Sequence, residues 1–373
     1  MKPKILFITP LPPPVHGSSM VSKQIKDSLV IRGAFDCDFV NLSTSRKMDE
    51  IQKFSVTKIL RLIGIYFNVL FKLIVHRYDL CYCAIACFGS PFLKDAPVVL
   101  LCKLFGRKVL IHQHNKGMHL YKDKLVFRSL YPLVYKNTKV MLLSWRLYDD
   151  ISSVVSKEQV CICPNGVAPI ENIIPSEKNE GNGQAIRFLY LSNLIPSKGC
   201  NALLDALQIL KQRGILFTCD FIGGDCPEQS ANTFVSLIQE KKLDDCTFYQ
   251  GRKYGKDKDA FYRKADVFVF PTFYEAECFP LVLLEAMQYG LPCISTTEAA
   301  IPDIIVNGKN GLLVEFTPDE QTFAARIADA MVWMAEHAEE RKAMGRNGKH
   351  IFQEQFTEDK FISTFVKNLK ASL

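Results

Sequence analysis

Two series of short apolar runs, separated by one polar segment, limit most strongly how this chain can fold. In the first half, runs such as KILFIT (residues 4–9) and KVLIHQH (residues 108–114) alternate with stretches of helical periodicity. The alternation starts again at IRFLYLSNL (residues 186–194), after the turn-rich segment SEKNEGNGQ (residues 176–184). Strands that alternate with helices form parallel βαβ units. We therefore predict an α/β fold with two domains, each built on a parallel sheet.

The length of 373 residues also favours two domains, because it exceeds what one ordinary hydrophobic core supports. The expected strands lie within residues 4–9, 35–43, 78–86, 108–114, 139–144, 186–194, 217–225, 246–251, 266–272 and 291–296. We place an N-terminal domain at residues 1–170, a linker at 171–185 and a C-terminal domain at 186–350. A last helix at 351–373 packs on one domain or crosses back to the first.

The cysteines and the first residues of the sequence bear on the cellular compartment in which the protein is expected. The thirteen cysteines are scattered through apolar segments without the spacing of a zinc site. The apolar run in MKPKILFITPLPPP is too short for the core of a signal peptide, and no cleavage pattern follows it. We expect reduced thiols in a cytoplasmic protein, with no bound metal.

The net charge of +7 is concentrated in the first 180 residues, whereas the remainder is mildly acidic. This asymmetry favours an anionic partner for the first half. Nucleic acid is not favoured, because the basic residues are not interleaved with stacking aromatics.

Residues 53–78 are both apolar and basic, with Lys53, Lys58, Arg61, Lys72 and Arg77 and no acid. Their uninterrupted apolar stretch is too short to span a bilayer, which needs about 20 residues. Two interpretations remain open: a basic amphipathic helix on an anionic membrane surface, or an ordinary buried helix.

EAECFPLVLLEAMQYG (residues 275–290) places two acids, Glu277 and Glu285, around the expected start of a helix. Pro280 suits the first turn of that helix, and Gly290 suits its end. The segment between the acids, with Cys278, Phe279, Pro280 and Leu281, would present backbone N–H groups to a phosphate. A sugar joined through phosphates to a nucleoside would fit, with hydroxyls at both carboxylates.

Residues 265–314, which contain this segment, resemble the signature region of retaining GT-B glycosyltransferases of family 4. CPNGVAP (residues 163–169), FLYLSNLIPSKG (188–199) and FIGGD (221–225) resemble further parts of that family in the same order. The resemblance implies two Rossmann-like domains that face a cleft. It also implies a nucleotide-sugar donor on the second domain, a saccharide acceptor on the first, retention of configuration, and no cofactor or metal.

The resemblance also implies roles for single residues. Glu277 would hold the hydroxyls of the donor sugar, Glu285 the ribose, and Lys198 the pyrophosphate. Gly17 would let the backbone approach the donor phosphate and the acceptor. His114 would face the donor sugar, while His112 is either a second site residue or a core histidine.

The sequence departs from the family pattern at several positions. Asn193 stands where an arginine is usual, and Arg252 or Lys253 would compensate for the missing cation. Pro280 replaces a common glycine, and Ala299–Ala300 replace a frequent glycine pair. These departures leave the identity of the donor undecided, and we favour a UDP-sugar over a GDP-sugar.

The expected reaction is transfer of a hexosyl or N-acetylhexosaminyl group to a saccharide. A lipid-linked saccharide at the inner face of the cytoplasmic membrane is the favoured acceptor, as in cell-surface polysaccharide synthesis. The alternatives are a nucleotide-sugar epimerase or a phosphorylase on the same scaffold, and a catalytically silent subunit that binds nucleotide-sugars.

Overall fold

The computed structural model describes residues 2–45, 55–170 and 185–373. The chain divides into two compact units, of which the first contains residues 1–166 and 358–373 and the second contains residues 167–357. The sequence placed the corresponding boundaries at 170 and 350. The expected linker at 171–185 lies outside the described residues except at its last position.

The first unit is built on a six-stranded parallel sheet with the order β2-β1-β3-β4-β5-β6. Its strands are β1 (Lys4–Thr9), β2 (Asp36–Asn41), β3 (Leu80–Ala84), β4 (Lys108–His112), β5 (Lys139–Leu142) and β6 (Val160–Ile162). The central strands β1, β3 and β4 are buried along most of their length, as expected where helices cover both faces of a parallel sheet.

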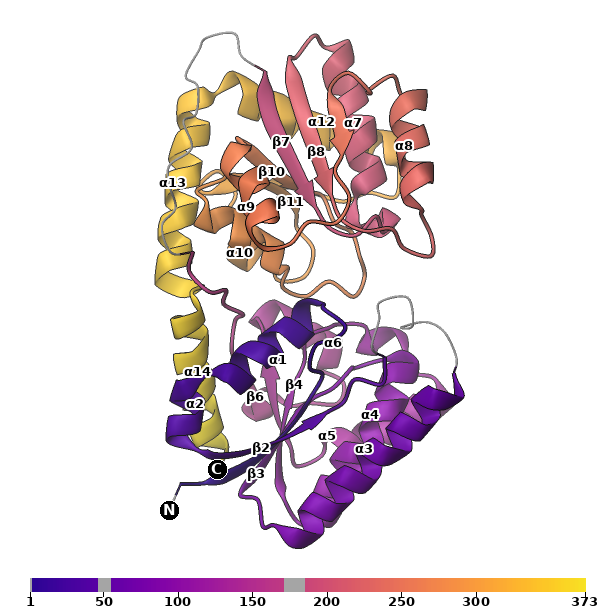
Figure 1. Ribbon diagram of the computed structural model, residues 1–373, viewed down its shortest axis with the longest axis vertical. Helices are drawn as coiled ribbons and strands as arrows, with labels where there is room; N and C mark the ends of the chain where they lie inside the picture. The colour runs from indigo at the N-terminus through magenta and orange to yellow at the C-terminus, as the bar shows by residue number, and fades with distance from the viewer. Residues whose placement is uncertain (1, 46–54, 171–184) are drawn as a thin grey trace. The chain divides into compact units, whose positions relative to one another are not determined.

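The helices of the first unit form two layers (Figure 1). They are α1 (Gly17–Asp27), α2 (Leu29–Ala34), α3 (Val56–Val75), α4 (Gly89–Leu104), α5 (Leu125–Tyr135), α6 (Tyr148–Ile151) and α14 (Glu358–Ser372). Helices α3, α4 and α5 pack side by side in one layer, while the C-terminal α14 contacts α2 and β4. Phe365 of α14 lies edge-on against Tyr82 of β3, with 5.2 Å between ring centroids.

The second unit has its own six-stranded parallel sheet, with the order β12-β11-β10-β7-β8-β9. The strands are β7 (Ile186–Leu191), β8 (Phe217–Ile222), β9 (Thr247–Tyr249), β10 (Val267–Phe270), β11 (Cys293–Thr296) and β12 (Gly311–Val314). Because β7 and β10 are neighbours, the loops that follow them meet at the carboxyl edge of the sheet.

Seven α-helices are described in the second unit. They are α7 (Cys200–Gln212), α8 (Ala231–Glu240), α9 (Gly255–Lys264), α10 (Leu281–Gln288), α11 (Ile301–Ile304), α12 (Glu320–Glu336) and α13 (Ala338–Gln355). Helix α12 packs on α7, and α13 packs on α10, which carries Glu285.

The predicted α/β fold class with two parallel sheets is confirmed, and each of the ten expected strands is present. Strands β6 and β12 were not expected. The segment between β1 and β2 forms two helices, α1 and α2, because Ser28 between them adopts an extended conformation and its side chain caps α2 by accepting from the Ile31 N–H.

Two glycines allow α13 to approach α10 closely. A Cβ atom at Gly345 would lie 2.2 Å from the carbonyl oxygen of Gly290, which follows α10 in the left-handed region at φ 69°. Any side chain at position 345 would therefore push α13 away from the helix that carries Glu285.

We expect Gly345→Ala to lower the free energy of unfolding by about 1–3 kcal/mol, as overpacking of a well-packed contact does. Thermal unfolding measures the loss. The control is Gly33→Ala in α2, where nothing lies within 4 Å of an added Cβ. The control should be neutral or slightly stabilising, and equal effects of the two substitutions would contradict the packing argument.

Candidate functional site

An ion pair between Lys198 and Glu277 lies at the carboxyl edge of the second sheet. Lys198 Nζ donates to Glu277 Oε2, and only 16% and 10% of the two side chains are exposed. Lys198 also lies over the ring of Tyr274, 4.5 Å from its centroid. The structure thus brings together the two residues that the sequence assigned to phosphate and to sugar hydroxyls.

The ion pair is fixed by a close contact between the loops that follow β7 and β10. Gly199, at φ 87°, ends the 3₁₀ turn Pro196–Lys198, and a Cβ there would lie 2.2 Å from the carbonyl oxygen of Pro271. The Phe273 N–H donates to the Ser197 carbonyl oxygen at 2.8 Å. Only glycine allows this approach, so backbone contacts hold Lys198 beside Glu277.

Glu285 is held by two residues of α9. Lys258 Nζ donates to Glu285 Oε1 and the Tyr262 hydroxyl donates to Oε2, each at 2.8 Å. Burial and then the Glu285 charge raise the pKa of Tyr262, so it remains a hydrogen-bond donor. A carboxylate offers about four lone-pair sites. Glu285 can therefore accept further hydrogen bonds from a ligand while α9 holds it.

The segment between the two acids differs from expectation at the helix start. Pro280 is the N-cap of α10 and not a residue of its first turn, so the helix begins at Leu281. Cys278 and Phe279 are buried, at 3% and 5% exposure. The Phe279 ring packs edge-on against Phe356, with 5.8 Å between centroids. Both side chains therefore support the loop from inside the unit.

The replaced glycine pair keeps a glycine-like backbone. Ala299 adopts φ 49°, in the left-handed region that residues with a side chain rarely occupy. The Ala300 N–H donates to the Cys278 carbonyl oxygen at 3.1 Å, which ties this loop to the segment between the two acids. Ala299 thus adopts a backbone conformation that glycine occupies more readily.

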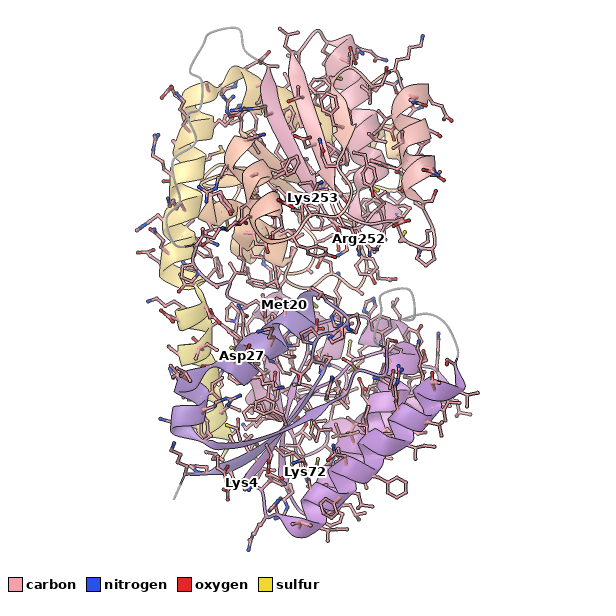
Figure 2. All side chains as sticks on the ribbon, in the orientation of Figure 1. Lys4, Met20, Asp27, Lys72, Arg252 and Lys253 are labelled. Atoms are coloured by element: carbon pink, nitrogen blue, oxygen red, sulfur yellow. The ribbon has the colours of Figure 1, made fainter. Side chains whose placement is uncertain are left out.

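Arg252 lies against the loop that follows β8, and Asn193 is hydrogen-bonded to the same loop. The Asn193 side chain accepts a hydrogen bond from the Gly224 N–H at 3.2 Å. The guanidinium of Arg252 covers Gly224 so closely that a Cβ there would lie 1.7 Å from Arg252 Nε. Figure 2 shows Arg252 and Lys253 together on the loop that follows β9. Of the two candidates for the missing cation, Arg252 is therefore the one in contact with this loop.

The first unit contains a cluster of aromatic and histidine side chains at the end of β4. His112 is fully buried, and its Nδ1 lies 2.8 Å from the Tyr82 hydroxyl. The rings of His112 and His114 lie 4.0 Å apart. The Nε2 atoms of both histidines are buried and have no hydrogen-bond partner among the residues that the structure describes. Such orphaned atoms indicate room for a ligand or water.

Burial keeps these histidines neutral. It lowers the pKa of His112 well below its ordinary value. Burial, and then the nearby His16, lowers the pKa of His114 to about 4. His16 is the N-cap of α1 and accepts from the Ser19 N–H at 3.4 Å. Gly17 is the first residue of α1, and nothing described lies within 4 Å of a Cβ added there, so the space beside it is open.

Sequence reasoning missed the supporting residues of these clusters. Tyr82, Lys258 and Tyr262 belong to apolar or mixed segments without a motif, and only the packing of elements distant in sequence brings them to the site. His16 directly precedes the glycine that was selected, so its position next to Gly17 was the available signal.

None of the described residues forms a group of three or more His, Cys, Asp or Glu that could hold a metal ion. Within the same residues no helix is long and apolar enough to cross a membrane. All thirteen cysteines are free thiols, and most are buried.

Comparison with known proteins shows a likeness to one family of glycosyltransferases. Residues 173–351 match the sequence model of the glycosyl transferases group 1, which covers most of the second unit. The sequence of this part of the chain is therefore similar to that family. It is 31% identical over 151 residues to the putative colanic acid biosynthesis glycosyltransferase WcaL of Salmonella typhimurium, across 39% of this chain and 36% of the relative. It is 28% identical over 202 residues to the amylovoran biosynthesis glycosyltransferase AmsK of Erwinia amylovora, across 52% and 48%. The chain thus spans between about a third and a half of these curated relatives.

Solved structures show that the chain shares the GT-B fold. Sucrose-phosphate synthase from Thermosynechococcus elongatus matches with a TM-score of 0.76 and 18% identity, over 100% of each chain. Alr3699/HepE from Anabaena, in complex with UDP and glucose, matches with a TM-score of 0.72 and 17% identity, over 98% of this chain and 99% of its own.

The depressed pKa of His114 predicts a loss of stability at acid pH. Between pH 6.5 and 4 the unfolded chain binds a proton at this residue that the folded chain does not bind, so the free energy of unfolding falls as the pH decreases. From pH 6.5 to 5 the contribution is about 2 kcal/mol. His114→Gln should remove it, as measured by urea unfolding at both pH values. The exposed His350 supplies the control, His350→Gln, and equal pH dependence in the two variants would disprove the assignment.

Proposed function

We propose that this chain is a glycosyltransferase that moves a sugar from a nucleotide-sugar to a saccharide acceptor in the synthesis of a cell-surface polysaccharide. The observation that carries the proposal is the buried Lys198–Glu277 pair at the carboxyl edge of the second sheet. It offers a cation for a diphosphate beside a carboxylate for sugar hydroxyls. The relatives named for colanic acid and amylovoran synthesis support the polysaccharide context.

The second unit holds the donor in this proposal. Lys198 and Arg252 stabilise the diphosphate as it leaves, which is preorganised electrostatic stabilisation of the developing charge. Arg252 takes the place of the arginine that Asn193 replaces. Glu277 binds the sugar hydroxyls, and Glu285, held by Lys258 and Tyr262, binds the ribose hydroxyls. The two protein cations supply the charge that a bound metal would otherwise supply.

A UDP-sugar is the donor we favour, because Alr3699/HepE was solved with UDP and glucose; a GDP-sugar is the alternative. We further propose transfer of a hexosyl or N-acetylhexosaminyl group with retention, in which the leaving phosphate accepts the proton of the acceptor hydroxyl. In this proposal Glu277 is engaged by the sugar hydroxyls, and none of the residues given a role acts as a covalent nucleophile, which favours this route over a covalent sugar–enzyme intermediate.

The first unit contributes the acceptor site and His114. With its pKa lowered to about 4, the His114 imidazole is neutral at physiological pH, so it exchanges hydrogen bonds with sugar hydroxyls without adding charge. His112 is hydrogen-bonded to the Tyr82 hydroxyl, and its ring packs against the ring of His114 and so positions it. The acceptor is a lipid-linked saccharide at the inner face of the cytoplasmic membrane.

Substitutions at the ion pair separate the roles of its two members. We expect Lys198→Ala to weaken UDP binding about tenfold and to lower kcat/KM by about 10²–10³. Glu277→Gln should abolish transfer but preserve or strengthen UDP binding, because it releases Lys198. It should also remove the extra affinity for UDP-sugar over UDP. Calorimetric titration of each variant with UDP and with UDP-sugars measures these differences.

The control for this series is Glu240→Gln, at the exposed end of α8, which should behave as the unaltered chain. Absence of any thermal-shift response to UDP, GDP, ADP and their sugars would disprove the proposal. Nucleotide binding without turnover would identify a silent subunit. A sugar nucleotide altered without acceptor would identify an epimerase, and dependence on phosphate would identify a phosphorylase.

A further inference from the structure

Helix α3 presents a continuous apolar ridge to solvent. Only Val69 and Leu73 of its 20 residues are buried, so the alternative of an ordinary buried helix is wrong. The ridge consists of Val56, Ile59, Leu60, Ile63, Phe67, Phe71, Ile74 and Val75, which are between 42% and 66% exposed. Their spacing of three and four residues places them along one side of the helix. No charged residue interrupts them.

The basic residues of α3 do not flank this ridge as the sequence suggested. Lys72 pairs with Asp38 at 3.4 Å, and Lys4 lies 3.6 Å from the same carboxylate (Figure 2). Arg61 donates to the Thr44 carbonyl oxygen at 2.9 Å. At about 100° per residue, Arg61 and Lys72 lie well over 90° from the middle of the ridge. Lys53 lies outside the described residues.

The surrounding segment is nevertheless strongly basic. Residues 46–135, which span α3, α4 and α5, contain 15 Lys or Arg and 5 Asp or Glu, whereas the whole chain has a net charge of only +7. The chain outside this segment is therefore slightly acidic. Exposed cations of the segment include Arg77, Lys122, Lys124 and Arg128. This charge attracts an anionic surface and repels a second copy of the same face.

The neighbouring helices of the same layer, α4 and α5, also expose apolar side chains. Leu104 at the end of α4 is 79% exposed, and Leu125, Val126 and Leu133 of α5 are 82%, 58% and 57% exposed. Exposed apolar surface on this scale marks an interaction site. The charge of the segment decides in favour of a lipid surface over self-association.

A polar pocket adjoins the ridge on α3 itself. It has a volume of about 350 Å³, and its lining includes Pro13 after β1, Asn41 at the end of β2, Ser43, and Arg61, Gly64 and Asn68 of α3. Gly64 and Asn68 directly follow the ridge residues Ile63 and Phe67 along the chain. The pocket thus lies at the carboxyl edge of the first sheet, beside the apolar surface.

We propose that the ridge on α3 docks the chain on an anionic bilayer, so that the neighbouring pocket receives the polar part of a lipid-linked acceptor. The evidence for docking is the exposed ridge and the net positive charge of residues 46–135. The choice of acceptor rests on the proposed function. The helix lies in the interface with its apolar side among the acyl chains, and the basic segment adds electrostatic attraction.

Vesicle flotation tests the docking independently of catalysis. The full chain should bind vesicles that contain phosphatidylglycerol and bind phosphatidylcholine vesicles far less. Ile63→Ser, Phe67→Ser and Phe71→Ser combined should reduce the bound fraction about tenfold. The matched control, Leu29→Ser with Val30→Ser, removes two side chains of α2 that are 84% and 60% exposed, and it should leave binding unchanged. The replaced side chains are exposed, and unaltered thermal unfolding confirms that each variant folds.

Three outcomes distinguish docking on a bilayer from self-association and from failure of the proposed function. A dimer that the triple substitution dissociates, without vesicle binding by the unaltered chain, would identify a second copy as the occupant and overturn the proposal. A thermal shift with nucleotides but no vesicle binding would also overturn docking, and would leave the proposed function intact. Vesicle binding lost in the triple variant, without any nucleotide response, would support docking and refute the proposed function.

Discussion

The Lys198–Glu277 ion pair is the interaction on which the chemistry of the second unit depends. Removing two charges from water is costly unless they meet in good geometry. The geometry comes from the backbone, because Gly199 lets the loop after β7 contact Pro271 after β10. In the proposed function, a diphosphate competes with Glu277 for Lys198, and the sugar hydroxyls compete with Lys198 for Glu277. A complete donor satisfies both charges at once, whereas a free nucleotide leaves Glu277 without its cation. The pair therefore favours the whole donor over its fragments.

The same principle applies at the other charges of this sheet edge. Glu285 is held by Lys258 and Tyr262, and Arg252 lies against Gly224 and near Asp225. Each of the charged side chains named here already has a protein partner. A ligand that binds to one of them therefore replaces an existing interaction. Preorganisation of this kind lowers the cost of orienting the groups when the reaction occurs.

Much of the fold and part of the site follow from sequence, for identifiable reasons. Buried parallel strands are continuous apolar runs, and the ten expected strands were found on that pattern, whereas β6 and β12 were not. Lys198 was selected through the family resemblance, and Glu277 through that resemblance together with its place before the expected start of a helix. Both follow strands whose carboxyl ends lie at one edge of the sheet, which is why the structure brings them together. Lys258, Tyr262 and Tyr82 were not selected, because their partners depend on how α9 and β3 pack. That Pro280 is the N-cap and not a residue of the first turn could be seen only from its backbone conformation.

Helix α3 shows why periodicity alone could not settle the interpretation of residues 53–78. A helix that packs one apolar side on a sheet and exposes another has the same composition as a fully buried helix. The sequence also does not show where the basic side chains point, since Lys72 forms an ion pair with Asp38 within the first unit. The net attraction to an anionic surface depends on summed charge and not on which lysine faces outward. The ridge thus supplies insertion, the segment of residues 46–135 supplies long-range attraction, and neither requires a basic residue on the ridge.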